Sequence, residues 1–190
     1  MEMKILEKAR EFAEYHHNGT NHKYDGKPYT YHLSMVVEVA ERFIHLIPVN
    51  KRDTVLAACW CHDTIEDCRV TYNDVKSELG EEVANIVYAL TNEKGKTRKE
   101  RANDKYYEGI RNTKGAVFVK LCDRIANVQY SKMTKSSMFK KYKEENPNFL
   151  SKLGFNVNLD NGIPMNWEGV EDVSYLMPMV EYLEKLFNEE

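Results

Sequence analysis

The sequence has no run of apolar residues close to the roughly 20 that a membrane-spanning helix requires. Its first residues, MEMKILEKAREFAEYHH, also lack the apolar segment of a signal peptide. The formal net charge is only −3, from 27 basic and 30 acidic residues, so there is no bulk electrostatic attraction to nucleic acid or to an anionic membrane. We therefore expect a cytoplasmic protein that binds neither nucleic acid nor membranes.

Cysteine is scarce and never occurs as a C-x-x-C pair. The four cysteines are Cys59, Cys61, Cys68 and Cys122. A zinc site at Cys59 and Cys61 is one interpretation, but residues two apart on a helix point to nearly opposite sides. Buried thiols that act as small hydrophobic side chains are the other interpretation, and the one we favour for a reducing compartment.

Strand patterns are also nearly absent, because the β-branched residues fall at helical rather than alternating spacing. There is no internal repeat, low-complexity tract or linker, and 190 residues with 42% apolar content suit one domain, residues 1–190. We predict an all-α bundle of roughly eight helices with polar groups meeting in its core. The helical segments are expected within residues 3–17, 32–47, a stretch containing 57–67, 71–79, 81–90, 115–133, 137–145 and a last helix with Pro178 in its first turn.

Residues 57–67, AACWCHDTIED, place polar groups inside an otherwise apolar segment. If this segment is one helix, at about 100° per residue, four metal-capable or acid–base groups fall within an arc of roughly 140°. They are His62, Asp63, Glu66 and Asp67. Burial of charge without a partner is costly, so a cation or a network of partners is expected to compensate for it.

Partners for this segment come from two other parts of the chain. Residues 115–133, GAVFVKLCDRIANVQYSKM, are densely apolar except for Asp123 and Asn127, which share one helix face. They form either a structural network or part of a polar site. Residues 18–29, NGTNHKYDGKPY, are predicted to be a loop whose His22 and Lys23 are either solvated or a clamp on an anionic or planar ligand. His32 opens the helix that follows.

The arrangement of His32, adjacent His62 and Asp63, and distant Asp123 resembles the H...HD...D pattern of the HD phosphohydrolase superfamily. Further motifs are similar to those of the RelA/SpoT-type hydrolases, which include small single-domain alarmone hydrolases. In order, they are GKPYTYH, HDTIED, VTYNDVKSELGEEVANIVYALT and VKLCDRIANV. The resemblance covers about residues 3–145. We expect residues 146–190 to be an irregular segment followed by a helix packed on the bundle.

The resemblance implies a fold, a metal and a reaction. The implied metal ligands are His32, His62, Asp63 and Asp123. Mixed nitrogen and oxygen ligands suit manganese (Mn²⁺), or another divalent cation such as iron (Fe²⁺), better than a closed zinc site. Glu66 and Asp67 match the pair that positions or activates the attacking water, and Asn127 matches a nucleotide-contacting asparagine. The implied reaction is hydrolysis of a small-molecule nucleotide, the 3′-pyrophosphate of guanosine tetra- or pentaphosphate, to GDP or GTP and pyrophosphate.

The chain departs from the family in two places. Where an Arg-Lys pair is common it has Lys23 and Tyr24, with His22 just upstream and one extra loop residue, and it has Leu33 in place of a proline. Lys23 and His22 are the candidate substrate contacts in this loop. Because lysine does not stack on a purine as a guanidinium does, a different nucleotide or phosphoester is the alternative substrate. A non-catalytic nucleotide-binding HD module is the alternative from another class, and no oligomeric state follows from these patterns.

Overall fold

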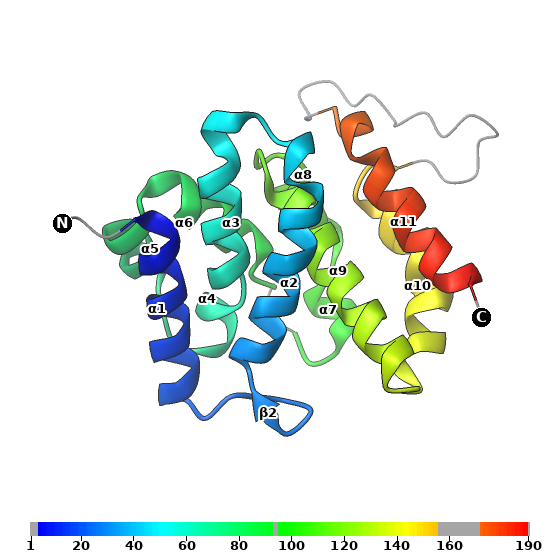
Figure 1. Ribbon diagram of the computed structural model, residues 1–190, viewed down its shortest axis with the longest axis horizontal. Helices are drawn as coiled ribbons and strands as arrows, with labels where there is room; N and C mark the ends of the chain where they lie inside the picture. The colour runs from blue at the N-terminus through cyan, green and yellow to red at the C-terminus, as the bar shows by residue number, and fades with distance from the viewer. Residues whose placement is uncertain (1–3, 93–94, 156–171, 190) are drawn as a thin grey trace.

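A computed structural model, described over residues 4–92, 95–155 and 172–189, shows helices and one short hairpin (Figure 1). Its α-helices are α1 (Ile5–Gly19), α2 (Thr30–Phe43), α3 (Arg52–Cys61), α4 (Thr64–Asp67), α5 (Tyr72–Leu79), α6 (Glu81–Leu90), α7 (Arg98–Arg101), α8 (Asp104–Arg111), α9 (Ala116–Met133), α10 (Met138–Lys152) and α11 (Met177–Asn188). Strands β1 (Lys23–Tyr24) and β2 (Lys27–Pro28) form the hairpin, and 3₁₀ turns cover Ile44–Leu46, Val49–Lys51 and Ser174–Leu176. The all-α fold that we predicted is confirmed.

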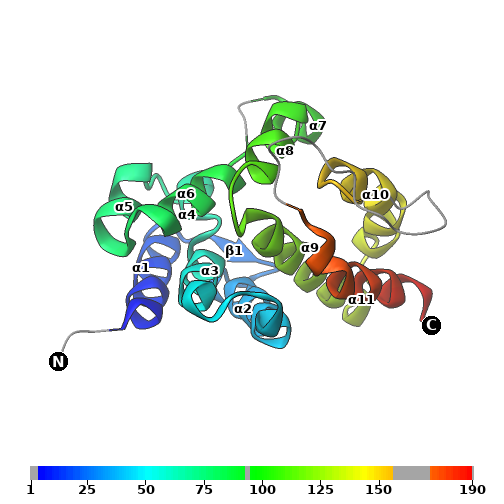
Figure 2. The ribbon, with the colours of Figure 1, turned by 90° about the horizontal axis from the view of Figure 1, so that it is seen from above.

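Helix α3 lies at the centre of the bundle and packs against α1, α2, α6 and α9. Its Ala57 and Ala58 are fully buried, and such small side chains let neighbouring helices approach closely. Seen from above, α10 and α11 lie together on one side of α9, while α1 and α5 lie at the opposite end of the molecule (Figure 2). The core is therefore deepest where α2, α3 and α9 meet.

Several helix boundaries follow from local chemistry, as predicted. At the start of α5, Thr71 and Asp74 form a capping box, with the Thr71 amide donating to Asp74 Oδ2 at 2.8 Å. Pro178 lies in the first turn of α11. The inward face of α11 is confirmed too, since all five predicted core residues are buried. They are Met179, Val180, Leu183, Leu186 and Phe187.

The segment 57–67 is two helices rather than the one we predicted. Helix α3 ends at Cys61, and the single turn of α4 begins at Thr64. Two side chains contact backbone carbonyls at this break. The Thr64 hydroxyl donates to Cys61 O at 2.8 Å, and His62 Nδ1 lies 2.9 Å from Cys59 O. His62 and Asp63 therefore sit at a break in the helix and not on a common helical face with α4.

Two other segments differ from prediction. The predicted loop 18–29 contains the hairpin, in which Asp25 and Gly26 have φ of +49° and +78°, the left-handed pair of a tight two-residue turn. Residues 146–152, predicted to be irregular, continue α10 through Pro147, because Phe149 and Leu150 are buried and tertiary packing overrides local preference. Residues 156–167 of that prediction lie outside the described part of the chain.

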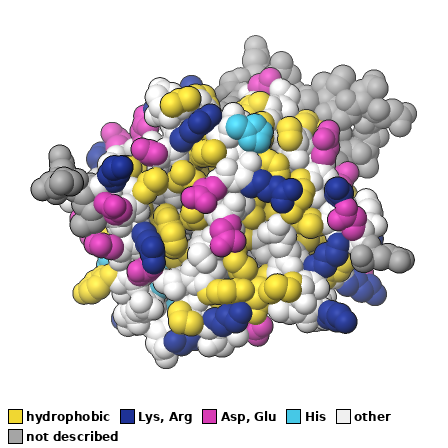
Figure 3. Space-filling view, viewed as in Figure 1, with side chains coloured by type: hydrophobic (Ala, Val, Ile, Leu, Met, Phe, Trp, Pro, Cys, Tyr) yellow, Lys and Arg dark blue, Asp and Glu magenta, His cyan; other side chains and the backbone are white. Residues whose placement is uncertain are grey.

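The distribution of surface charge and the burial of the cysteines agree with what the composition predicts. Acidic and basic side chains are mixed over the described face seen in Figure 3. No helix in the described ranges combines the length and apolar character needed to cross a bilayer. All four cysteines are free of disulfides and buried, as expected of thiols that act as small hydrophobic side chains.

Candidate active site

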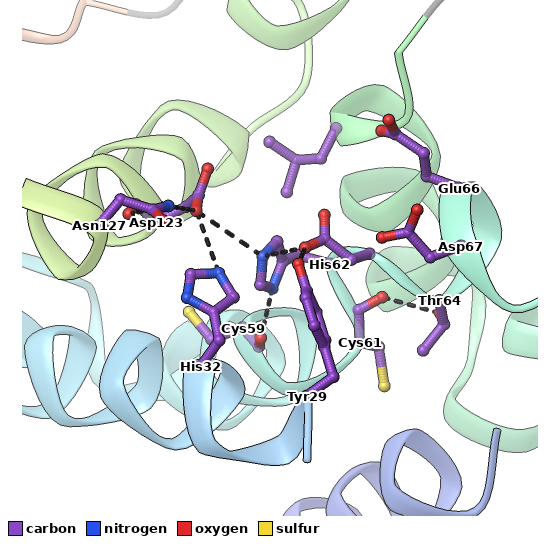
Figure 4. Close-up of polar contacts among 12 residues, drawn as sticks. Tyr29, His32, Cys59, Cys61, His62, Thr64, Glu66, Asp67, Asp123 and Asn127 are labelled. Atoms are coloured by element: carbon purple, nitrogen blue, oxygen red, sulfur yellow. Dashed lines mark hydrogen bonds and ion pairs between the residues drawn. The ribbon is translucent and has the colours of Figure 1, made fainter. Parts of the chain in front are cut away.

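Three potential ligands from three segments meet at the centre of the bundle. His32 comes from the first turn of α2, His62 follows α3, and Asp123 lies on α9. One ligand atom from each lies within 4.8 Å of the other two. His32 Nε2 is 3.3 Å from Asp123 Oδ1, and His62 Nε2 is 4.0 Å from the same oxygen. Figure 4 shows the three side chains pointing toward one another.

Neighbouring positive groups favour the ionised form of Asp123 and of Asp63, which lies beside the cluster. Although burial opposes ionisation, Lys120, whose Nζ is 3.1 Å from Oδ2 of Asp123, helps to hold the pKa of Asp123 well below its usual range. Burial likewise opposes ionisation of Asp63, but the adjacent His62 lowers the pKa of Asp63. Asp63 Oδ2 also accepts a hydrogen bond from the Tyr29 hydroxyl and lies 3.0 Å from His62 Nε2. The two carboxylates are thus paired with Lys120 and His62 in the protein interior.

The cluster fits a divalent cation. His62 is oriented by its Nδ1 contact with Cys59 O, which leaves its buried Nε2 facing the cluster, 3.0 Å from Asp63 Oδ2 and 4.0 Å from Asp123 Oδ1. A buried ring nitrogen that converges with two carboxylate oxygens provides the mixed nitrogen and oxygen ligands that a divalent cation binds. Burial disfavours a charged ring, yet Asp63 and Asp123 raise the pKa of His62 to about 9, so metal binding must displace a proton there.

Glu66 and Asp67, both on α4, have different environments. The Glu66 carboxylate is held by Asn92, whose side-chain Nδ2 lies 3.0 and 2.8 Å from the two oxygens and whose backbone N lies 3.2 Å from one of them. Burial, together with the negative charges of Asp63 and Glu66, raises the pKa of Asp67 to about 7. Its Oδ2 lies 3.7 Å from His22 Nδ1. Asp67 is therefore the carboxylate that can exchange a proton near neutral pH.

A cleft of about 580 Å³ opens beside Asp123 and Asn127. This volume lies within the range of small-molecule sites. Its other walls are cationic and aromatic, and they include Lys120, Arg124, Lys141, Lys152, Tyr106 and Tyr142. Ammonium and guanidinium groups bind phosphate oxygens strongly, and rings offer surfaces for a base. The cleft therefore suits an anionic, partly aromatic ligand.

Comparison with protein families identifies the chain. A model described as HD domain matches residues 9–154. The chain belongs to the HD domain family. Its match extends past residue 145, where the resemblance seen in the sequence ended.

The HD domain is also similar to curated proteins, each called guanosine-3′,5′-bis(diphosphate) 3′-pyrophosphohydrolase. MESH1 of Danio rerio is 29% identical over 125 residues, which cover 66% of this chain and 67% of that protein. MESH1 of Xenopus tropicalis is 31% identical over 126 residues, covering 66% and 68%. The Aquifex aeolicus protein is 32% identical over 128 residues, which are 65% of this chain but only 17% of that protein. The predicted resemblance to RelA/SpoT-type hydrolases is confirmed.

A solved structure shares the fold over nearly the whole chain. It is described as a metazoan ortholog of SpoT that hydrolyzes ppGpp, and it matches with a TM-score of 0.67 and 16% identity. The match covers 99% of this chain and 98% of the other. The HD domain fold therefore includes the C-terminal helices, which pack on α9.

The structure brings some of the predicted site residues together and leaves others apart. His32, His62 and Asp123 form the ligand cluster, with Asp63 beside it. Asn127 adjoins the cluster, since its Nδ2 donates to Asp123 Oδ1 at 2.5 Å and to Asp123 O at 2.9 Å. Glu66 and Asp67 lie on α4, and His22 stacks on Tyr29 near Asp67. Lys23 is exposed on β1.

Sequence reasoning missed three residues that hold these groups in place. Lys120 precedes Asp123 by three residues, a spacing that puts both on one helix face and could have identified it. Tyr29 lies within the GKPYTYH motif but carried no signal that it would donate to Asp63. Asn92 follows α6 and reaches Glu66 only through the tertiary fold.

Proposed function

We propose that this HD domain hydrolyses the 3′-pyrophosphate of guanosine tetra- and pentaphosphate to GDP or GTP and pyrophosphate. The observation that carries the proposal is the cluster of His32, His62 and Asp123 at the edge of a cationic cleft of about 580 Å³. The relatives called guanosine-3′,5′-bis(diphosphate) 3′-pyrophosphohydrolase support the choice of substrate. The proposed setting is the cytoplasm, with residues 1–190 acting as one domain.

The proposed ligands of a divalent cation, Mn²⁺ or another such as Fe²⁺, are four side chains. They are His32, His62, Asp63 and Asp123. A bound divalent cation would polarise a phosphoryl oxygen and acidify water at the site. The protein supplies orientation: Cys59 O fixes the ring of His62, and the Tyr29 hydroxyl fixes Asp63.

Asp67 is the proposed acceptor of the proton that the attacking water loses. A pKa of about 7 leaves it partly ionised at neutral pH, the range in which a general base works best. Glu66, fixed by Asn92, is the group proposed to orient that water. The water oxygen joins phosphorus and leaves with pyrophosphate, while the bond between phosphorus and the ribose 3′-oxygen breaks and that oxygen takes a proton.

The cleft supplies the proposed contacts to the nucleotide. Asn127 lies beside Asp123 and lines the cleft, so it can contact the nucleotide next to the reacting phosphate. Lys120 and Lys141 line the same space and offer positive charge to the substrate phosphates. His22 and Lys23 are weaker candidates, since His22 stacks on Tyr29 and Lys23 is exposed.

A substrate panel tests the proposal. Purified protein with Mn²⁺ is incubated with ppGpp, pppGpp, their adenosine counterparts, GTP and ATP, and products are followed by chromatography. We expect pyrophosphate release from ppGpp and pppGpp, and loss of that release in Asp63→Asn. Hydrolysis of ppGpp that survives Asp63→Asn would contradict the assigned site.

One observation favours a second substrate class. At the positions where relatives commonly carry an Arg-Lys pair, Lys23 is exposed and Tyr24 is already stacked on His32, so neither presents a guanidinium to a guanine. A different nucleotide or phosphoester is therefore the second candidate. Turnover of an adenosine compound without turnover of ppGpp would establish it, and equal inactivity of both proteins on every compound would indicate a non-catalytic binding module.

A further inference from the structure

Tyr24 contacts one proposed metal ligand and is linked to a second, without being a ligand itself. Its ring is stacked on His32, with centroids 4.7 Å apart and an angle of 16° between the planes. Its hydroxyl donates a hydrogen bond to Asn127 Oδ1 at 2.9 Å. Asn127 in turn donates through Nδ2 to Asp123. Tyr24 thus contacts His32 directly and is linked to Asp123 through the side-chain amide of Asn127.

His32 lacks the hydrogen bond that usually orients a metal-binding histidine. A ligating histidine normally donates its second ring nitrogen to a carbonyl or carboxylate, which fixes the tautomer and the ring plane. His62 has such a partner in Cys59 O, but His32 Nδ1 is buried without one. The face-to-face contact with Tyr24 is therefore what holds the plane of the His32 ring on that side.

The Tyr24 hydroxyl completes the hydrogen bonding of the Asn127 amide. The carbonyl and carboxylate oxygens of Asp123 only accept hydrogen bonds, so they fix Nδ2 toward Asp123 and leave Oδ1 to accept from the Tyr24 hydroxyl. If the hydroxyl were removed, Oδ1 would lose this donor and the amide would be held from the Asp123 side alone. The Asp123 oxygen that faces both histidines would then be held less firmly.

We propose that Tyr24 is a positioning residue that holds His32 and Asp123 ready for the metal. This inference rests on the metal site of the proposed function. Tyr24 does not act as a platform for the substrate base, because its ring is packed against His32 and is met by Tyr29 and Tyr130 at 74° and 63°. The aromatic residue that departs from the Arg-Lys pair of the relatives thus supports the catalytic centre instead of the nucleotide.

The β1–β2 hairpin brings Tyr24 to this place and provides a matched control. Two hydrogen bonds join the hairpin to α9 about one turn apart, from Tyr24 to Asn127 and from the Tyr130 hydroxyl to Asp25 Oδ2 at 2.7 Å. Tyr130→Phe removes a hydroxyl from the same aromatic cluster and a hairpin-to-helix bond, but it leaves the path to Asp123 intact. It therefore separates loosening of the hairpin from loss of ligand positioning.

Mn²⁺ binding to the full chain, measured by isothermal titration calorimetry, tests the proposal without any substrate. We expect Tyr24→Phe to weaken Mn²⁺ binding roughly tenfold, and Tyr24→Leu, which also removes the stack, up to roughly 100-fold. Tyr130→Phe is expected to bind like the unaltered protein. Hydrolysis by Tyr24→Phe should recover as Mn²⁺ is raised, with little change in the substrate KM, and circular dichroism checks that each variant is folded.

Unchanged Mn²⁺ affinity in both Tyr24 variants would overturn the proposal. So would an equal loss in Tyr130→Phe, or a raised substrate KM with normal Mn²⁺ affinity, which would assign Tyr24 to the nucleotide. Weaker Mn²⁺ binding by Tyr24→Phe in a protein that turns over no ppGpp would support the positioning role and refute the proposed substrate.

Discussion

Asp67 shows a conflict between stability and catalysis at the scale of one residue. Its pKa is raised to about 7 by burial and by the charges of Asp63 and Glu66, whereas an aspartate in an unfolded chain titrates near 4. Between these values the folded state keeps a proton that the unfolded state has released. The free energy of unfolding therefore falls as pH rises from about 4 through 7, and the loss persists above pH 7.

We predict that Asp67→Asn stabilises the metal-free protein at pH 8 while it lowers hydrolysis by roughly 100- to 10,000-fold, the usual contribution of a general base. Urea denaturation at pH 5 and pH 8, with chelator present, measures the first effect. Asp104→Asn is the control, since that side chain is 95% exposed. If Asp67→Asn raises the free energy of unfolding no more at pH 8 than at pH 5, the raised pKa of Asp67 is contradicted.

His17 has the opposite pH dependence. It is fully buried, stacks on Tyr29 and lies with its Nδ1 3.2 Å from His22 Nδ1. Burial lowers the pKa of His17 to about 4, against about 6.5 in an unfolded chain. The unfolded state therefore takes up a proton first as pH falls. The stability that His17 contributes is complete above pH 6.5 and is lost between about 6.5 and 4.

Replacement of the His17 ring tests this pH dependence of stability. We predict that the metal-free protein loses roughly 2–3 kcal/mol of unfolding free energy from this group between pH 6.5 and 4. His17→Phe, which keeps an aromatic ring next to Tyr29, should lose less over the same interval. Denaturant unfolding at half-unit pH steps gives both curves, and parallel curves would exclude His17 as the source of acid sensitivity.

At the scale of helices and strands, the sequence predicts those helix boundaries that depend on residues close together in the chain. The cap of α5 at Thr71 and the proline at the start of α11 are local signals, and both helices begin where expected. The break after Cys61 was not predicted, because residues 57–67 contain no proline or glycine to mark it. At this break the His62 and Thr64 side chains contact the carbonyls of Cys59 and Cys61. The hairpin was missed because strands of two residues have no alternating pattern, although its Asp25-Gly26 turn is a recognisable signal.

In the candidate site, too, some residues could be found from the sequence and others only from the structure. His32, His62 and Asp123 were found from spacing and resemblance, and the fold brings them within 4.8 Å. The side chains that orient the site were not found, because Tyr24 and Asn92 act through contacts between distant elements. Such partners depend on the tertiary arrangement, so a motif indicates the chemistry of a site but not the network that orients it.

The junction between α9 and its neighbours depends on Gly115. This residue has φ of +84°, and a Cβ there would lie 3.1 Å from Val55 Cγ1 and 3.2 Å from Ile86 Cδ1. We predict that Gly115→Ala destabilises the protein by roughly 2–4 kcal/mol, from backbone strain and from overpacking. Gly26→Ala meets nothing within 4 Å and should cost only the strain, roughly 1–2 kcal/mol. Urea denaturation compares them, and equal losses would refute the packing argument.

At the scale of the whole molecule, the candidate metal centre joins elements that the chain brings together only on folding. Helices α2 and α9 supply His32 and Asp123, and His62 follows α3. An unfolded chain does not hold these groups together, so a cation that binds them binds the folded state far better. Metal binding and global stability are therefore coupled.

That coupling predicts a thermal shift that needs no substrate. At a Mn²⁺ concentration 100 times its Kd, the folded state gains about 2.7 kcal/mol, which for a chain of this length raises Tm by roughly 5–10 °C. Asp123→Asn should abolish the shift because it removes an anionic ligand from the centre, whereas Asp104→Asn should keep it. Scanning calorimetry with Mn²⁺ and with chelator measures each difference. A full shift in Asp123→Asn would mean that Mn²⁺ stabilises the protein from a site other than the junction of α2, α3 and α9.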